Sequence, residues 1–105
     1  MGKYLLIYHG GSQPETKEAG KDVMAAWMKW FETLGPAVAD VGNPVSQTRT
    51  ITGGGAVAGG GGANPATGYS LINADSLDAA AHLAQGCPHL RAGGSVEVCE
   101  TMDVM

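Results

Sequence analysis

The stretch Lys3–Tyr8 reads KYLLIY, and from Tyr4 onward both alternating sets of side chains are apolar. Successive side chains of a strand point to opposite faces of a sheet, so this pattern is typical of a strand that is covered on both sides. A chain of 105 residues forms one domain with a single core. The helices of such a small domain cover one face of the sheet, so we expect the other face to need cover from outside the chain.

A first helix is predicted after this strand. Ser12, Pro14 and Glu15 are start signals, because Ser caps a helix, Pro is tolerated in the first turn and Glu completes a capping box. The helix is expected to end at Gly35-Pro36, since Gly suits the left-handed cap and Pro cannot continue a helix. Apolar side chains recur on one helix face and are expected in the core: Val23, Trp27, Trp30, Phe31 and Leu34.

The rest of the chain predicts further strands, a hairpin and a second helix. Asp75-Ser76 caps the second helix, which ends at Gly86 with Pro88 beyond it. The core face of this helix is expected to consist of Leu77, Ala80, Ala81 and Ala84. Strands are expected at Ala37–Val41, Thr67–Ala74 and Gly94–Met102, and a hairpin is expected to pair Arg49–Thr52 with Ala56–Ala58 around Gly53–Gly55.

This order of elements predicts an α+β fold, a ferredoxin-like βαββαβ sandwich with an inserted hairpin, formed by residues 1–105 as one domain. The sheet of a second copy is the economical cover for the face that the helices leave free. We therefore expect a homodimer, a dimeric α/β barrel with a space between the two sheets. Gly53–Gly62 is expected to be a mobile flap beside that space, because each glycine adds backbone freedom.

Composition argues against several classes of partner. The net charge is −4, and the six Lys and Arg residues are scattered, which argues against nucleic acid and against an anionic membrane surface. The longest apolar run, Tyr4–Tyr8, is too short to span a bilayer. The two cysteines do not form a disulfide scaffold, which fits a reducing compartment. We expect a cytoplasmic protein.

His9 and Glu97 are the candidate catalytic residues. His9 ends the first strand just before two glycines, where it can reach the mouth of a cavity and titrate near neutral pH. Glu97 lies between Val96 and Val98, so it projects onto the sheet face away from the helices. A carboxylate there is costly unless it is paired or lines a wet cavity. The alternatives are a His9 side chain bound to the loop backbone and a Glu97 side chain that simply meets water at the rim.

Cys87, His89 and Trp27 are the candidate ligand-binding residues. Cys87 follows a helix C-terminus, whose dipole disfavours a thiolate, while His89 and Arg91 offset that effect if they turn inward. We favour a structural role for the stretch Cys87-Pro88-His89, with Cys87 as a small buried hydrophobe at the base of a loop. Trp27 is expected in the core at its helical spacing, with the wall of a pocket for a flat ligand as the alternative.

Neither a metal site nor a cofactor is predicted. His82, Cys87 and His89 lack a spacing that would fix a tetrahedral zinc geometry. The run GGGAVA, residues 53–58, formally matches a dinucleotide-binding pattern, but it neither leaves a core strand nor opens a helix.

Four stretches together resemble the YCII-related family, and more narrowly its subgroup named after a DGPF motif: KYLLIYHG, AAWMKWFETLG, GCPHL and GGSVEV. The resemblance covers almost the whole chain. It implies a dimeric α/β barrel of ferredoxin-like protomers with an active-site cavity on the sheet face. It also implies a family that includes a dehydrochlorinase of chloroaromatic breakdown, and a subgroup with members encoded beside extracytoplasmic-function sigma factors.

The chain departs from this family in two places. The DGPF tetrapeptide is absent, and its hairpin region reads as residues 48–58 instead. The helix His and loop Asp of the better-studied branch fall near Trp27 and on Cys87, and these residues cannot form a His-carboxylate pair. That mechanism is therefore not transferred. The expected function is binding of a small organic molecule on the sheet face, with acid/base lyase or isomerase chemistry. The alternative is a non-catalytic dimeric ligand sensor or accessory protein linked to a sigma factor.

Overall fold

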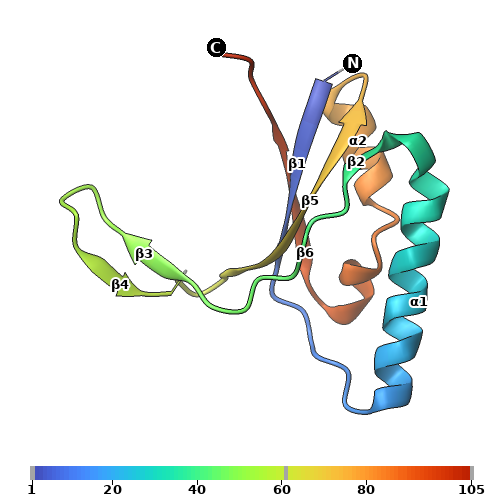
Figure 1. Cartoon of the computed structure of the whole chain (residues 1–105), viewed down its shortest axis with the longest axis horizontal. Coiled ribbons are helices and arrows are strands. Elements are labelled where there is room, and N and C mark those ends of the chain that lie inside the picture. Colours follow the sequence, from blue (N-terminus) through green and yellow to red (C-terminus); the bar gives the residue numbers. More distant parts are fainter. Residues whose placement is uncertain (1, 61, 105) are drawn as a thin grey trace.

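Strand β1 (Gly2–His9) lies inside a four-stranded sheet whose order is β2-β5-β1-β6 and whose neighbouring strands are all antiparallel (Figure 1). The computed structural model describes residues 2–60 and 62–104. The other elements, in chain order, are α1 (Lys17–Leu34), the 3-10 turn η1 (Gly35–Ala37), β2 (Val38–Asp40), β3 (Arg49–Ile51), β4 (Val57–Gly59), β5 (Ala66–Ala74), α2 (Leu77–Ala84), the 3-10 turn η2 (Pro88–Ala92) and β6 (Ser95–Glu100).

The predicted α+β class is confirmed. A strand and a helix are followed by a second strand, and the sheet is completed by a third strand, a helix and a fourth strand. The inserted hairpin is also confirmed, since β3 and β4 pair with each other as a separate two-stranded sheet between β2 and β5. None of the helices in the described part of the chain is long and apolar enough to cross a membrane.

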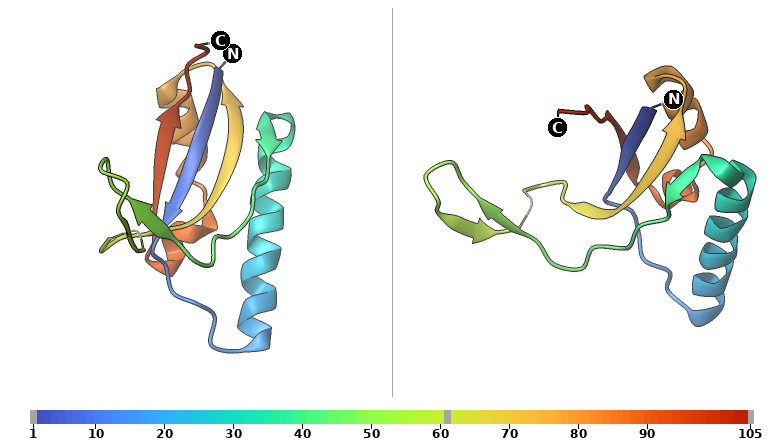
Figure 2. Two further views of the ribbon diagram at one scale, coloured as in Figure 1. Left: turned by 60° about the vertical axis from the view of Figure 1, so that its left-hand side comes forward. Right: turned by 45° about the horizontal axis from the view of Figure 1, so that its top comes forward.

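Both helices lie on the same side of the sheet (Figure 2). On that side Tyr4, Leu6 and Tyr8 of β1 are buried, and Leu6 is fully inaccessible to solvent. The buried apolar core consists of Tyr4, Leu6, Tyr8, Trp30, Leu34, Ile72, Ala74, Ala80, Ala84 and Cys87. One buried polar side chain, Ser70, accepts a hydrogen bond from the Tyr8 hydroxyl at 2.8 Å and donates one to the Val41 carbonyl at 2.6 Å. This short relay joins β1, β5 and the end of β2.

The opposite side of the sheet carries a second apolar set, which we call the open face. It is formed by side chains that are half-buried and lie in register across three strands: Leu5, Ile7, Tyr69, Leu71 and Cys99. No helix formed by the described residues lies on this side (Figures 1 and 2). Both alternating sets of β1 side chains are therefore apolar, but the helices cover only the set that contains Tyr4, Leu6 and Tyr8.

The hairpin of β3 and β4, residues 49–59, is called the arm below. It projects away from the sheet on the side opposite α1 in all three views (Figures 1 and 2). Its strands contact chiefly each other. A built Cβ at Gly53, Gly54 or Gly55 would meet nothing within 4 Å, so the turn of the arm lies in open space.

The predicted start of the first helix is wrong. Helix α1 begins at Lys17, and Thr16 is its N-cap, with the Thr16 hydroxyl accepting from the Ala19 N–H at 3.0 Å. Ser12 has another role, because its N–H donates to the Ala92 carbonyl at 2.9 Å and its hydroxyl donates to the same oxygen at 3.2 Å. Ser12 thus ties the loop after β1 to η2.

Two predicted core residues are substantially exposed. Val23 is 42% exposed because the first turns of α1 extend beyond the end of the sheet, where little lies beneath them (Figure 2). Leu77, the first residue of α2, is 43% exposed, and the helix is held instead by the buried Ala80 and Ala84. The expected ends of α1 at Leu34 and the capping of α2 by Ser76 are confirmed.

Candidate functional site

His9 and Glu97 meet at one end of the open face. His9 ends β1 opposite Ser95, and Glu97 pairs with Ile7, so the two side chains are diagonal neighbours on adjacent strands. The His9 Nε2 atom lies 3.0 Å from Oε1 of Glu97. The side chains are 18% and 60% exposed, respectively, so a small molecule in solution can reach this pair.

The second ring nitrogen of His9 also faces an oxygen. Nδ1 lies 3.0 Å from the backbone carbonyl of Asn64, which precedes Pro65 at the entry to β5. A carbonyl only accepts, so Nδ1 carries the hydrogen and donates it. Nε2 and the Glu97 carboxyl group are then within hydrogen-bond distance of each other at a solvent-accessible position. Two groups so placed can exchange a proton, which is what general acid/base chemistry requires.

Apolar side chains border this polar pair. Ile7 lies between Glu97 on β6 and Tyr69 on β5 in one row of the sheet, and Leu5 occupies the next row. A ligand placed beside His9 would therefore contact an apolar floor with one acid/base pair at its end. Tyr69 and Asn64 were not singled out by sequence reasoning. Tyr69 alternates with buried Ser70 and was detectable from strand parity, whereas the Asn64 carbonyl carries no signal in the sequence.

His89 lies next to His9 in space but serves the backbone. Its Nε2 donates to the main-chain carbonyl of His9 at 2.8 Å. The ring fits between Gly11 and Gly94, and a Cβ on Gly11 would stand 2.6 Å from the His89 ring, while one on Gly94 would overlap it. His89 therefore fixes η2 against the end of β1, and its ring is separated from the His9 ring by the strand itself.

Trp27 belongs to an aromatic cluster in the helical layer. Its ring meets Tyr8 edge-on with centroids 5.0 Å apart, and the His89 ring lies 6.3 Å away. Trp30 and Phe31 extend the cluster at 5.8 and 5.9 Å from Trp27. Aromatic pairs of this geometry add to the stability of a core. The structure thus places Trp27 on the face of the sheet opposite the pair of His9 and Glu97.

Cys87 is buried at the start of η2 and is 2% exposed. Burial raises the pKa of the Cys87 thiol to about 11, an effect partly offset by a hydrogen bond from the backbone N–H of His89. At neutral pH the side chain is a protonated thiol with its surface covered by the core. The five predicted site residues therefore separate into two groups, with His9 and Glu97 on the open face and Trp27, Cys87 and His89 on the helical side.

The raised pKa of Cys87 makes alkaline stability a test of its burial. Above pH 9 a thiol in the unfolded chain ionises, while the folded thiol keeps its proton up to about pH 11. The free energy of unfolding should therefore fall as the pH rises through this interval. Chemical denaturation at pH 7 and pH 10 measures it, and Cys87→Ala should show a smaller loss between the two than the wild-type protein. Equal losses in the two proteins would mean that the thiol reaches solvent.

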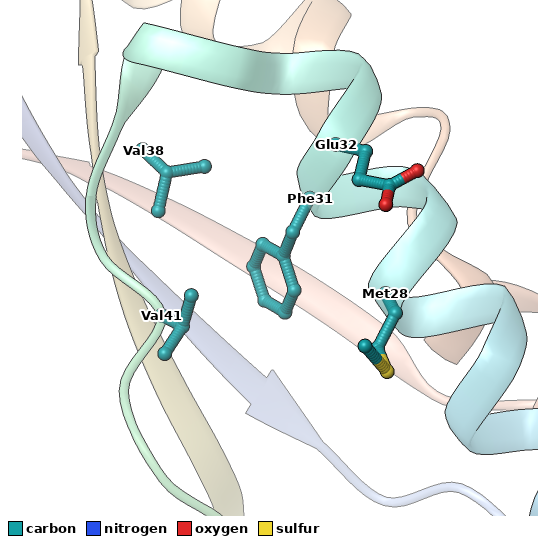
Figure 3. Close-up of a pocket in the computed structure, with 5 residues that line it drawn as sticks. All are labelled: Met28, Phe31, Glu32, Val38 and Val41. Carbon is teal, nitrogen blue, oxygen red and sulfur yellow. The ribbon is translucent and has the colours of Figure 1, made fainter.

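Two hollows lie on the helical side of the molecule. One, of about 370 Å³, is an apolar groove between α1 and the edge of the sheet (Figure 3), lined by Met28, Phe31, Glu32, Val38 and Val41. The other, of about 430 Å³, lies around the end of α1 and the start of α2, and its lining includes Leu34, Ala37, Asn73, Ala79 and His82. The predicted site residues line neither hollow. The pair of His9 and Glu97 lies outside both hollows, with side chains that are 18% and 60% exposed.

Comparison with known proteins gives a similarity to solved structures and none to a family model. No sequence model of a protein family matches it. No curated protein matches it either. Among solved structures it is similar to 5-chloro-2-hydroxyhydroquinone dehydrochlorinase from Burkholderia phenoliruptrix AC1100, determined in complex with 2,5-dihydroxybenzoquinone. The sequence identity is 21%, the TM-score is 0.48, and the match covers 89% of this chain and 90% of that chain.

Proposed function

We propose that this chain is a homodimeric, ferredoxin-like protein of the YCII-related type that binds a small organic molecule on the open face and transfers a proton to or from it. One observation carries the proposal. His9 stands between two oxygen acceptors, the Asn64 carbonyl and the Glu97 carboxylate, each 3.0 Å from a ring nitrogen. This pair is exposed at the end of an apolar surface rather than buried in the core.

Glu97 and His9 have complementary roles in this proposal. The Asn64 carbonyl holds the Nδ1 hydrogen and so orients the ring, and Nε2 and Glu97 share the proton that moves. When a substrate C–H or O–H group approaches, the Glu97 carboxylate accepts its proton and becomes a carboxylic acid. The His9 imidazolium donates its own Nε2 proton to another atom of the substrate and becomes neutral, and the proton on Glu97 then passes to Nε2. Proton transfer by a positioned pair of this kind is worth roughly a hundredfold or more in rate. Proton transfer of this kind is a step of many lyase and isomerase reactions.

The proposed dimer supplies the enclosure that the single chain lacks. A sheet of a second copy over Leu5, Ile7 and Leu71 would remove this apolar surface from water, at about 25 cal/mol for each Å² buried. A stable interface of this kind buries on the order of 1,000 Å² or more in total. The space left between two sheets would hold the ligand beside the pair of His9 and Glu97.

One observation favours a second candidate, a non-catalytic ligand sensor or accessory protein. The ring of His9 is held from both sides, and such a ring can serve as a fixed recognition element as well as a proton carrier. In that case a bound molecule would be recovered unchanged.

Glu97→Gln is the decisive substitution, because Gln keeps an oxygen that can accept from His9 Nε2 but cannot take up a proton. Small carbonyl compounds with acidic C–H groups, incubated with the protein in D₂O, exchange hydrogen for deuterium, and NMR measures the rate. Glu97→Gln should slow the protein-catalysed exchange about tenfold or more. Native mass spectrometry of the same samples shows whether a molecule is bound.

Glu100→Gln is the matched control, because it removes a carboxylate from the same strand whose contact is with Tyr4 instead of His9. It should leave the exchange rate unchanged. Equal rates in the wild-type protein and both variants would contradict the acid/base role of Glu97. A bound molecule recovered unchanged, together with equal exchange rates, would favour the sensor.

A further inference from the structure

The arm exposes an apolar pair at its far end. Ile51 and Val57 are directly opposed in the register of β3 and β4, and their side chains are 67% and 66% exposed. A two-stranded hairpin alone is marginally stable in water, and exposing two β-branched apolar side chains gives up the burial that would support it. The sequence of the arm is therefore suited to contact with another surface.

The base of the arm is fixed to the body. The N–H of Val45 donates to the Thr67 carbonyl at 3.0 Å, and the N–H of Tyr69 donates to the Asn43 carbonyl at 3.2 Å. On the exit side, the Asn64 carbonyl accepts from His9. The chain is thus bound to the sheet at Asn43 and Val45 before the arm and to His9 at Asn64 after it, and the arm leaves the sheet away from α1 (Figures 1 and 2).

This direction excludes the chain's own sheet as the surface that the arm covers. The arm extends outward past the open face instead of folding over it (Figure 2). Two copies that place their open faces together would bring the arm of each copy beside the body of the other. A two-fold axis would repeat this contact, since both copies present the same surface and the same arm.

The distribution of charge also favours a second copy of this chain as the surface that the arm contacts. Arg49 is the one charged residue in the sequence between Asp40 and Asp75, so the arm region is positive in a chain with a net charge of −4. The open face, in contrast, carries the exposed carboxylate of Glu97 beside its apolar residues. An arm with two apolar side chains and one cation complements an apolar face bordered by a carboxylate.

We propose that the arm is an intermolecular clamp, whose residues Ile51 and Val57 pack at the end of the second copy's open face that holds His9 and Glu97, beside the area covered by the paired sheets, and so enclose this pair. The inference rests on the proposed dimer. It goes beyond it because each site is then completed by the arm of the other subunit. The hydrogen bond from His9 Nδ1 to the Asn64 carbonyl connects the site with the arm of the same subunit. The histidine of the site thus also binds the chain after the arm.

The double substitution Ile51→Thr, Val57→Thr tests the clamp, because Thr retains the strand preference of a β-branched residue while removing apolar contact area. Analytical ultracentrifugation over a range of protein concentrations should give a dimer dissociation constant about tenfold or more above that of the wild-type protein. Met24→Gln is the matched control, since Met24 is 62% exposed on α1 and lies in the helical layer. It should leave the dissociation constant unchanged.

A second measurement locates the arm directly. A nitroxide label is attached at Gly54→Cys, at the turn of the arm, where a built Cβ meets nothing within 4 Å and Ile51 and Val57 are kept. Cys99→Ala in the same chain prevents labelling on the open face. This spin-labelled protein, without ¹⁵N, is mixed with ¹⁵N-labelled wild-type protein. Broadening of the amide signals of Leu5, Ile7 and Leu71 in the ¹⁵N-labelled subunit supports the clamp. Broadening confined to the residues of α1, or no intermolecular broadening in a dimeric sample, overturns it and leaves the proposed site to be judged by Glu97→Gln. A wild-type protein that is monomeric throughout the concentration range overturns the clamp and the dimer together.

Discussion

Leu6→Ala is expected to lower the free energy of unfolding by about 3 kcal/mol, within the range measured for truncating a fully buried leucine. Leu6 is fully inaccessible at the centre of β1 and faces the helices. Its removal leaves a void among side chains that are themselves held by the strand register, so the surroundings cannot collapse onto it. Chemical denaturation measures the change, and the slope against denaturant should stay constant.

Leu5→Ala provides the comparison, because Leu5 is the next residue on the same strand and points to the open face. In the isolated chain its side chain is half-buried, so truncation should cost less than at Leu6, about 1 kcal/mol. If open faces pair in a dimer, the cost of Leu5→Ala grows with protein concentration, while the cost of Leu6→Ala does not. Equal costs of the two substitutions at the lowest measurable concentration would mean that the two faces of β1 are covered alike within one chain.

The fold was predictable from signals that act locally. Gly35 and Pro36 end α1 because the glycine adopts a positive φ of 56° and the proline, inside the 3-10 turn η1, cannot continue the helix, and neither effect depends on distant residues. Ser76 likewise caps α2 through its own hydroxyl, which accepts from the Ala79 N–H at 3.0 Å. Such signals act in the folded chain as they do in isolation, because each one satisfies the unpaired backbone N–H or C=O groups of its own helix end.

The start of α1 was mispredicted for the opposite reason. Ser12 is an acceptable cap by itself, but the carbonyl of Ala92, 80 positions away in the sequence, takes its hydrogen bonds. Thr16 then caps the helix one turn later. The exposure of Val23 has a different cause, since the first turns of α1 extend beyond the end of the sheet and little lies beneath them (Figure 2). Long-range contacts decide such boundaries, and a single sequence does not contain them.

The positions of His9 and Glu97 were predictable from the sequence, but the contact between their side chains was not. Strand parity placed Glu97 on the face away from the helices, and the strand end placed His9 beside glycines. Their meeting depends on the register of β1 and β6, which pairs Ile7 with Glu97. A shift of one residue would have sent Glu97 to the helical face. The loop residues Cys87 and His89 reach the helical side because η2 packs against α1 and β6 and His89 binds the His9 carbonyl, an arrangement that no local pattern encodes.

Gly42→Ala is expected to be among the most damaging single substitutions outside the core. Gly42 follows β2 with a positive φ of 73°, where an L-residue is strained, and a Cβ at this position would overlap the backbone carbonyl of Tyr69. A flexible side chain could move aside, but a carbonyl inside β5 cannot move without disturbing the sheet. We expect the free energy of unfolding to fall by at least about 2 kcal/mol, which corresponds to a melting temperature lower by roughly 8 °C.

Gly93→Ala separates the overlap from the strain. Gly93 has a similar positive φ of 83°, yet a built Cβ there would meet nothing within 4 Å. Its replacement should therefore cost only the conformational strain, about 1 kcal/mol. The difference between the two variants in differential scanning calorimetry measures the overlap at Gly42, and equal melting temperatures would contradict the close approach of this segment to β5.

Gly42 also bears on the arm, because the segment that it begins carries the chain from the sheet into β3. If the segment moves away from β5, the hydrogen bonds from Tyr69 N–H to the Asn43 carbonyl and from Val45 N–H to the Thr67 carbonyl are lost, and with them the fixed direction of the arm. Gly42→Ala should therefore weaken the proposed dimer in protein that is still folded, at a temperature well below melting. Gly93→Ala should not, since it leaves both hydrogen bonds in place. Ultracentrifugation of the two variants at one temperature distinguishes an arm that is held at its base from one that finds the second copy without this support.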